Sequence, residues 1–215
     1  MRAVIESETV QQFTVAHGVD AQATLMAVDT GRKRTVSDIL RIMSDDPENP
    51  RTFRSIRNLP SIAKKVMTYE KTEDMNINSR VGVSITHQRL LDFILTHQHE
   101  MELAAAQGIR VTAVAPTILS GTAAAYCVCR EADASVADEF VREIINPSQT
   151  DGNAAWLLRQ QATKDRLKRT TSWTRDARMC AAYFIKAFNL YRSGTFRQVL
   201  VWKNVGPHAE AFPTV

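Results

Sequence analysis

Residues 29–40 read Asp29-Thr30-Gly31-Arg32-Lys33-Arg34-Thr35-Val36-Ser37-Asp38-Ile39-Leu40. Thr35 can cap a helix and Asp38, three residues later, can complete a capping box, so this stretch predicts a helix start. The first amides of a helix are free to bind an anion, and arginine can grip a phosphate with two hydrogen bonds. We therefore expect a phosphate-binding site made by Arg32, Lys33, Arg34 and Thr35. The alternative is a solvated loop whose cations pair with Asp29 and Asp38.

Further along the chain, apolar spacing and capping residues predict a mainly α fold. The expected helices cover 35–43, 51–71 (split at Pro60), 86–107 (opened by Thr86 and ended by Gly108), 116–132, 135–146 (with a second capping box at Ser135 and Asp138), 154–167 and 174–192. Strand composition appears at 10–17 and 197–202. These patterns predict two domains, a small truncated α/β piece over 1–46 and a multi-helix body over 47–215.

Composition excludes some classes of protein. The chain has 215 residues, of which 44% are hydrophobic, enough for a sizeable core. No apolar run approaches the roughly 18 residues that cross a bilayer, so no membrane partner is expected. The three cysteines, Cys127, Cys129 and Cys180, lack CxxC spacing. They predict reduced, buried thiols in a cytoplasmic protein.

The charges are unevenly distributed. Eleven bases and two acids lie between Trp156 and Asn204, a balance of +9, whereas 131–151 carries a balance of −5. Such asymmetry is typical of a nucleic-acid face, or of an acidic helix packed beside a basic one. The bases gather at a helix junction, so Arg166, Lys168, Arg169 and Arg175 are the expected DNA-binding residues. The interleaved aromatics Trp156, Trp173 and Tyr183 are interpreted as core, although stacking on bases is the alternative.

Two further groups of residues resemble catalytic or metal sites but lack the required partners. His97 and His99 lie about 200° apart on a helix, so they cannot share a metal ion without outside ligands. His87 lies earlier on the same predicted helix. Ser120-Gly121-Thr122 has a possible nucleophile, but nothing in the sequence places a histidine and a carboxylate beside it. Close helix packing is the better interpretation of this small-residue stretch.

Two short stretches carry a family resemblance. The segment Asp29-Thr30-Gly31-x-x-Arg34-Thr35-x-x-Asp38-x-Leu40, and the stretch Phe184-Ile185-Lys186-Ala187-Phe188-Asn189-Leu190-Tyr191-Arg192-Ser193-Gly194, resemble proteins of the ParB/sulfiredoxin-like superfamily found in phages and mobile elements. In that superfamily a DGQHR-type loop, which contacts nucleotide or substrate phosphate, precedes the first segment. The chain lacks this loop, so the resemblance implies a truncated member whose loop-dependent activity is lost.

Three functions remain open on this basis. The first is a DNA-associated accessory protein of a phage or mobile element that is not itself an enzyme. The second is a nucleotide-binding or nuclease-type enzyme that is active only with the missing loop, and the third is a helical protein-binding module. The expected partners are DNA, a nucleotide, or a second copy that covers an exposed strand edge in residues 1–17. The sequence specifies no cofactor.

Overall fold

A computed structural model describes residues 34–46, 52–76, 85–148, 152–167, 173–203 and 206–215. The α-helices are α2 (Val36–Ser44), α3 (Leu59–Thr72), α4 (His87–Thr96), α5 (Gln98–Val114), α6 (Leu119–Ala132), α7 (Ala134–Ile145), α8 (Ala154–Arg166) and α9 (Ala177–Arg192), with a short 3-10 helix η1 (Trp173–Arg175) before α9. No strand occurs in these ranges. The mainly α prediction is confirmed for this part of the chain.

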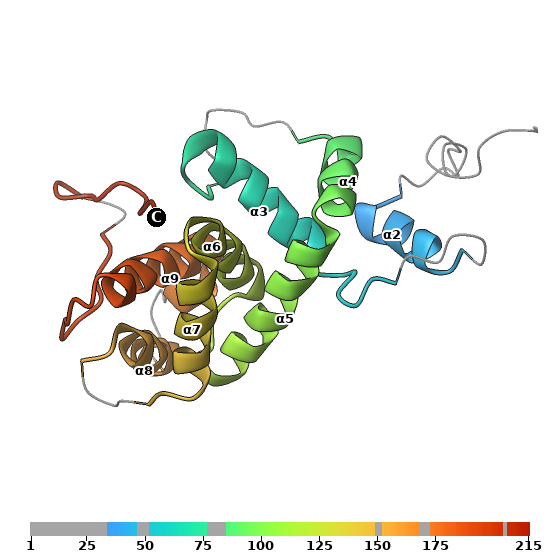
Figure 1. Cartoon of the computed structure of the whole chain (residues 1–215). Helices are drawn as coiled ribbons and strands as arrows, with labels where there is room; N and C mark the ends of the chain where they lie inside the picture. The colour runs from blue at the N-terminus through green and yellow to red at the C-terminus, as the bar shows by residue number, and fades with distance from the viewer. Residues whose placement is uncertain (1–33, 47–51, 77–84, 149–151, 168–172, 204–205) are drawn as a thin grey trace, which may run out of the picture. The chain divides into compact units, whose positions relative to one another are not determined.

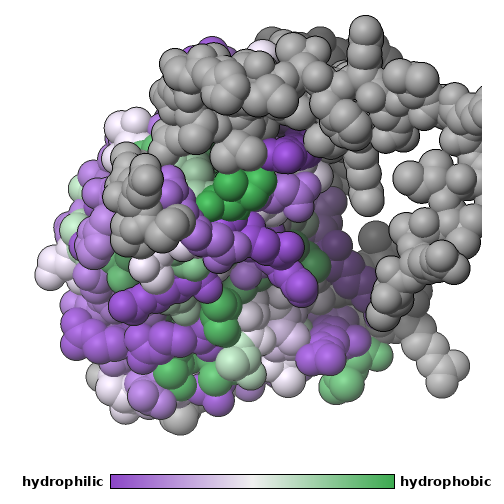
Figure 2. Space-filling view, turned by 90° about the vertical axis from the view of Figure 1, so that its right-hand side faces the viewer, coloured by the Kyte–Doolittle hydropathy of each residue, from purple (hydrophilic) through white to green (hydrophobic). Residues whose placement is uncertain are grey.

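Residues 35–215 form one compact unit, built around α6. Helix α6 packs against α3, α5, α7 and α9, as Figure 1 shows, and α8 covers α7 and α9. Alanines 123, 124 and 125 on α6 are completely buried, so the neighbouring helices can approach closely. The face of the molecule in Figure 2 is mostly hydrophilic, with separate hydrophobic patches between the polar side chains.

The small residues of α6 provide the closest helix contacts, as the sequence predicted. A Cβ atom added at Gly121 would lie 2.0 Å from the carbonyl oxygen of Ala177 on α9. At the contact between α5 and α6, a Cβ atom added at Gly108 of α5 would lie 2.9 Å from the Cβ of Ala123 on α6. The adjacent Thr122 is buried and its hydroxyl is hydrogen-bonded to that of Thr117 at 2.8 Å. The stretch 120–122 therefore serves helix packing.

Helix starts were predicted more accurately than helix continuity. The capping box of Thr35 and Asp38 is present, and Thr86 and Asn153 cap α4 and α8. The single helix predicted over 86–107 is wrong, because His97 leaves the helical conformation and separates α4 from α5. Helix α4 packs on α3, whereas α5 packs mainly on α6. The apolar faces of α4 and α5 therefore contact different helices. Gly108 does not end this region but lies inside α5.

Two other boundaries differ from the prediction. Pro60 does not split a helix over 51–71, because it occupies the first turn of α3, where proline is tolerated. The predicted capping box at Ser135 and Asp138 is also wrong. Asp133 caps α7 instead, through a 3.0 Å bond from the amide of Val136. The carboxylate of Asp138 is engaged elsewhere, since it accepts hydrogen bonds from the Tyr126 hydroxyl and from Arg130 Nε.

The predicted strand over 197–202 is replaced by an extended segment without a ladder. Leu200 and Trp202 are buried while Val199 and Val201 are exposed. Successive side chains therefore alternate between core and solvent, as they do in a strand. The backbone of Leu200, however, is hydrogen-bonded by a side chain and not by another strand. The amide of Gln161, in the orientation that satisfies both groups, accepts from the Leu200 nitrogen at 3.0 Å and donates to its oxygen at 2.9 Å. Since the described part of the chain contains no second strand, no sheet is present in it.

The expected α/β piece and the exposed strand edge of residues 1–17 lie outside the described residues. Helix α2, within the predicted first domain, buries Val36, Leu40 and Met43 in the same core as the later helices. None of the described helices is long and apolar enough to cross a membrane.

Candidate functional site

The predicted phosphate site at the start of α2 is described only in part. Arg32 and Lys33 lie outside the described residues, and Arg34 is partly exposed beside Thr35. The carboxylate of Asp38 accepts from the Thr35 amide at 3.0 Å and from the Thr35 hydroxyl at 2.7 Å. An acidic group therefore already lies at this helix start, close to where a phosphate would bind. Any phosphate would have to bind against that negative charge.

Many bases of the C-terminal half are engaged within the fold. Arg178 donates to both carboxylate oxygens of Asp74, at 2.6 and 2.5 Å, and its guanidinium lies 4.9 Å from the ring centroid of Trp202 and 5.3 Å from that of Phe212. Lys186 is bound to the carbonyl of Val201 and to Glu210. Arg159 donates to the carbonyl of Ile145 at 3.1 Å. These side chains hold the tail and the loops in place.

The basic side chains at the junction of α8 and η1 differ from these engaged bases. Lys164 and Arg166 in the last turn of α8, and Arg175 in η1, are exposed and have no ion-pair partner in the described ranges. The buried carboxylate of Asp165 accepts from the amide of Thr174 at 3.4 Å, which ties η1 to the end of α8. The structure thus brings Arg166 and Arg175 to the same junction. The other two predicted DNA-binding residues, Lys168 and Arg169, lie between them outside the described residues.

The aromatic residues among these bases mostly belong to the core, as predicted. Tyr183 is buried, and its hydroxyl accepts from the amide of Trp202 at 3.4 Å. Trp156 is half-buried and packs against the core. The side chain of Trp173 lies outside the described residues. Base stacking therefore has no support from Tyr183 or Trp156.

The histidines on α4 and α5 lie at the surface. His87 opens α4, His97 ends it, and the rings of His97 and Phe93 have centroids 4.6 Å apart. His99 is exposed on α5. Among the described residues, no group of three or more histidine, cysteine, aspartate or glutamate side chains could hold a metal ion.

The three thiols are free, as expected. Cys129 and Cys180 are buried and Cys127 is half-buried. Burial raises the pKa of the Cys127 and Cys180 thiols to about 12. The Cys180 sulfur accepts a hydrogen bond from the amide of Ile118 at 3.3 Å, a contact that favours the thiolate but is outweighed by burial. These groups are therefore protonated, and poor nucleophiles, near neutral pH.

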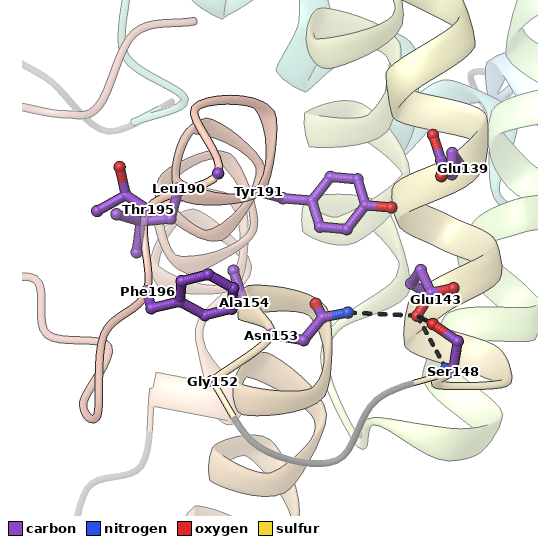
Figure 3. Close-up of a pocket in the computed structure, with 11 residues that line it drawn as sticks. Glu139, Glu143, Ser148, Gly152, Asn153, Ala154, Leu190, Tyr191, Thr195 and Phe196 are labelled. Carbon is purple, nitrogen blue, oxygen red and sulfur yellow. Dashed lines mark hydrogen bonds between the residues drawn. The ribbon is translucent and has the colours of Figure 1, made fainter.

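Two pockets were not predicted from the sequence, because each gathers residues from several helices. The first, of about 250 Å³, lies between α7, the start of α8 and the end of α9 (Figure 3). Its lining includes Glu139 and Glu143 of α7, and Tyr191 and Phe196 from the α9 side. Glu143 is held by hydrogen bonds from the Ser148 amide and hydroxyl and from Asn153. Of the described residues that line this pocket, none is an arginine, lysine or histidine.

The second pocket, of about 290 Å³, is formed by α3, α4, α5 and α6. Val66, Met101 and Tyr126 make its buried floor. Its rim has mixed charge, because Glu70, Glu100 and Glu131 lie there together with Arg130 and His97. Burial, and next the charge of Glu131, raise the pKa of Glu70. Arg130 is already paired with Asp138, at 3.3 Å.

Comparison with known proteins adds no assignment: no protein-family model, curated protein or solved structure matches the chain.

Proposed function

We propose that the protein is a DNA-associated accessory protein, of the kind that phages and mobile elements carry, and that it contacts the DNA backbone through the α8–η1 junction. The observation that carries this proposal is the contrast between two sets of bases. Arg159, Arg178 and Lys186 are engaged within the fold, whereas Arg166 and Arg175 are exposed and form no ion pair with any residue that the structure describes. Free, exposed bases are the groups that neutralise phosphates.

The local geometry supports this role for the junction. The only acid directly beside Arg166 in sequence, Asp165, is buried and turned to the Thr174 amide, so its carboxylate lies away from the exposed surface. Lys164 adds a third exposed base in the same turn of α8. The two bases of the intervening segment, Lys168 and Arg169, extend the positive charge along the chain. Phosphate contacts of this type give affinity without sequence specificity.

A structural role is the competing explanation. Lys164 and Arg166 lie in the last turn of α8, where cations stabilise the helix dipole. That role gives a contribution to stability and none to DNA affinity. The two explanations are therefore separated by measuring both quantities for the same variants.

The experiment measures the affinity for a 20-base-pair duplex by fluorescence anisotropy over a series of salt concentrations. The slope of log K against log salt is about −0.9 for each phosphate neutralised. The Arg166→Ala/Arg175→Ala variant should therefore flatten the slope by about 1.8, and Arg166→Ala/Lys168→Ala/Arg169→Ala by about 2.7. The matched control, Arg89→Ala/Arg110→Ala, removes two exposed bases from α4 and α5 and should leave the slope unchanged.

Two results would overturn the proposal. One is the absence of duplex binding at the lowest salt concentration. The other is an equal slope for the wild type and the junction variants, with a loss of thermal stability alone. That second result would assign Arg166 to the stabilisation of α8.

A further inference from the structure

The pocket in Figure 3 differs in charge from the basic junction, although both involve α8. It lies at the start of this helix, while Arg166 ends it about 20 Å away along 13 residues of 1.5 Å rise. Glu139 and Glu143 are one turn apart on α7 and face the same space. Among the described residues, its lining contains two carboxylates and no cationic side chain, so this pocket disfavours phosphate. Its ligand must therefore be of another class.

Two aromatic rings complete the wall. Tyr191 extends from the last turn of α9 toward the two glutamates, and Phe196 lies beside the start of α8 (Figure 3). The Phe196 ring packs on Gly152, where an added Cβ would lie 2.7 Å from ring atom Cδ1, and where φ is +80°. Both the space and the backbone conformation thus require glycine at this position. One side of the Phe196 ring contacts Gly152, and the residue is still 67% exposed.

The polar groups of this pocket are oriented by hydrogen bonds among themselves. Glu143 is fixed by Ser148 and Asn153, so its negative charge is held in one position. Burial, then the charge of Glu139 and a hydrogen bond to its carboxylate, raise the pKa of Tyr191 to about 12, so its hydroxyl stays neutral and is directed toward Glu139. The amide end of α8 has the opposite polarity, but the Asn153 side chain caps it through the amide of Ala155 at 2.9 Å. Arg142, between the two glutamates on α7, opposes their effect on Tyr191, but the two carboxylates outnumber it.

From these features we propose that the pocket between α7, α8 and α9 binds an organic cation, an alkylammonium or guanidinium group, between the rings of Tyr191 and Phe196 and the carboxylate of Glu139. Aromatic faces attract such cations, and a neighbouring carboxylate adds charge complementarity. The volume of about 250 Å³ lies below the roughly 300–1,000 Å³ of pockets for drug-sized ligands. The pocket suits a single head group, either of a free amine or of a basic side chain. The proposal does not depend on DNA binding.

The test is a titration of the full chain followed by the amide signals of Gly152 and Asn153. The probes are butylammonium, N-acetyl-lysine methylamide, N-acetyl-arginine methylamide and spermidine, with N-acetyl-norleucine methylamide as the neutral analogue. We expect saturable shifts with the cations and none with the neutral analogue. Tighter binding of spermidine than of the amino-acid amides indicates a free polyamine as ligand, and the reverse order indicates a basic side chain.

Variants assign the binding to the named groups. Glu139→Gln removes one exposed charge and Phe196→Leu removes one ring face, and each should weaken binding about tenfold. Phe196→Tyr keeps the ring and should keep the affinity. Glu131→Gln on α6 removes the same charge outside the pocket and serves as control. Equal binding of the neutral analogue, or unchanged affinity in both Glu139→Gln and Phe196→Leu, overturns the proposal.

Discussion

Replacing Gly121 by alanine tests the contact between α6 and α9 directly. The new Cβ would lie 2.0 Å from the carbonyl oxygen of Ala177, and 2.8 and 2.9 Å from its carbonyl carbon and Cα. To reach even 3.0 Å, the helices must separate by about 1 Å, because backbone atoms cannot rotate away. A gap of this size forfeits about a quarter to a half of each dispersion contact across it.

The expected cost follows from two opposing effects. Overpacking a core costs about 1–3 kcal/mol, and a backbone clash belongs at or above the upper end. Alanine regains about 1 kcal/mol of helix propensity relative to glycine. We expect Gly121→Ala to lower the free energy of unfolding by about 2 kcal/mol or more, which corresponds to a fall of at least roughly 4–8 °C in melting temperature.

Gly108→Ala is the matched control, since it makes the same chemical change in α5. Its Cβ meets only the Cβ of Ala123, at 2.9 Å, so a small shift relieves the contact. Its net effect should be within about 1 kcal/mol of zero. Urea denaturation followed by circular dichroism measures both variants.

A second variant identifies the atom responsible. Adding Ala177→Gly to Gly121→Ala should restore no stability, because the clash is with the backbone carbonyl of residue 177. Rescue by this change, or a smaller loss for Gly121→Ala than for Gly108→Ala, would refute the reasoning.

Three other changes probe separate parts of the chain. Arg178→Leu should destabilise the fold by about 2 kcal/mol, since it leaves a half-buried carboxylate unpaired, and should shift the fluorescence of the buried Trp202 to the red; an unchanged emission spectrum would contradict this role. Folding raises the pKa of the Cys180 thiol to about 12, so protonation of this thiol stabilises the fold fully below about pH 8.5, and this contribution is lost as the pH rises toward 12. Between pH 8 and 10.5 the unfolding free energy of Cys180→Ala should therefore fall less than that of the wild type. Parallel curves for the two proteins would exclude Cys180 as a source of the pH dependence. Arg32→Ala/Arg34→Ala should abolish amide shifts in the first turn of α2 caused by millimolar nucleotide or short duplex DNA, and a wild type without such shifts would make this cluster a solvated loop.

The sequence predicted those features that depend on neighbouring residues. The helix starts at Thr35 and Thr86 were found because each side chain bonds to an amide three residues later. Asn153 was interpreted only as part of a turn before the next helix, although it caps α8. The break at His97 was missed, since no glycine or proline marks it and the cause is a change of packing partner. Asp138 was misassigned for a similar reason: its partners, Tyr126 and Arg130, are on the preceding helix.

The same distinction applies to the candidate sites. Sequence charge located the basic region, but it could not show that Arg178 within this region is paired with Asp74, which lies 104 residues earlier. The pocket of Figure 3 draws its carboxylates from α7 and its rings from the α9 side, so no single stretch of sequence contains it. Only the path of the chain in space brings these groups together.

The bond between Asp74 and Arg178 has a consequence for how the molecule opens. Arg178 also contacts Trp202 and Phe212, so one guanidinium links the end of α3, the first turn of α9 and the C-terminal segment. Regions that share such an anchor are released in one cooperative event. Amide protons near Met75 and in the segment around Trp202 should therefore exchange with solvent at a common rate, so that a change near residue 74 alters the susceptibility of the distant tail to proteolysis.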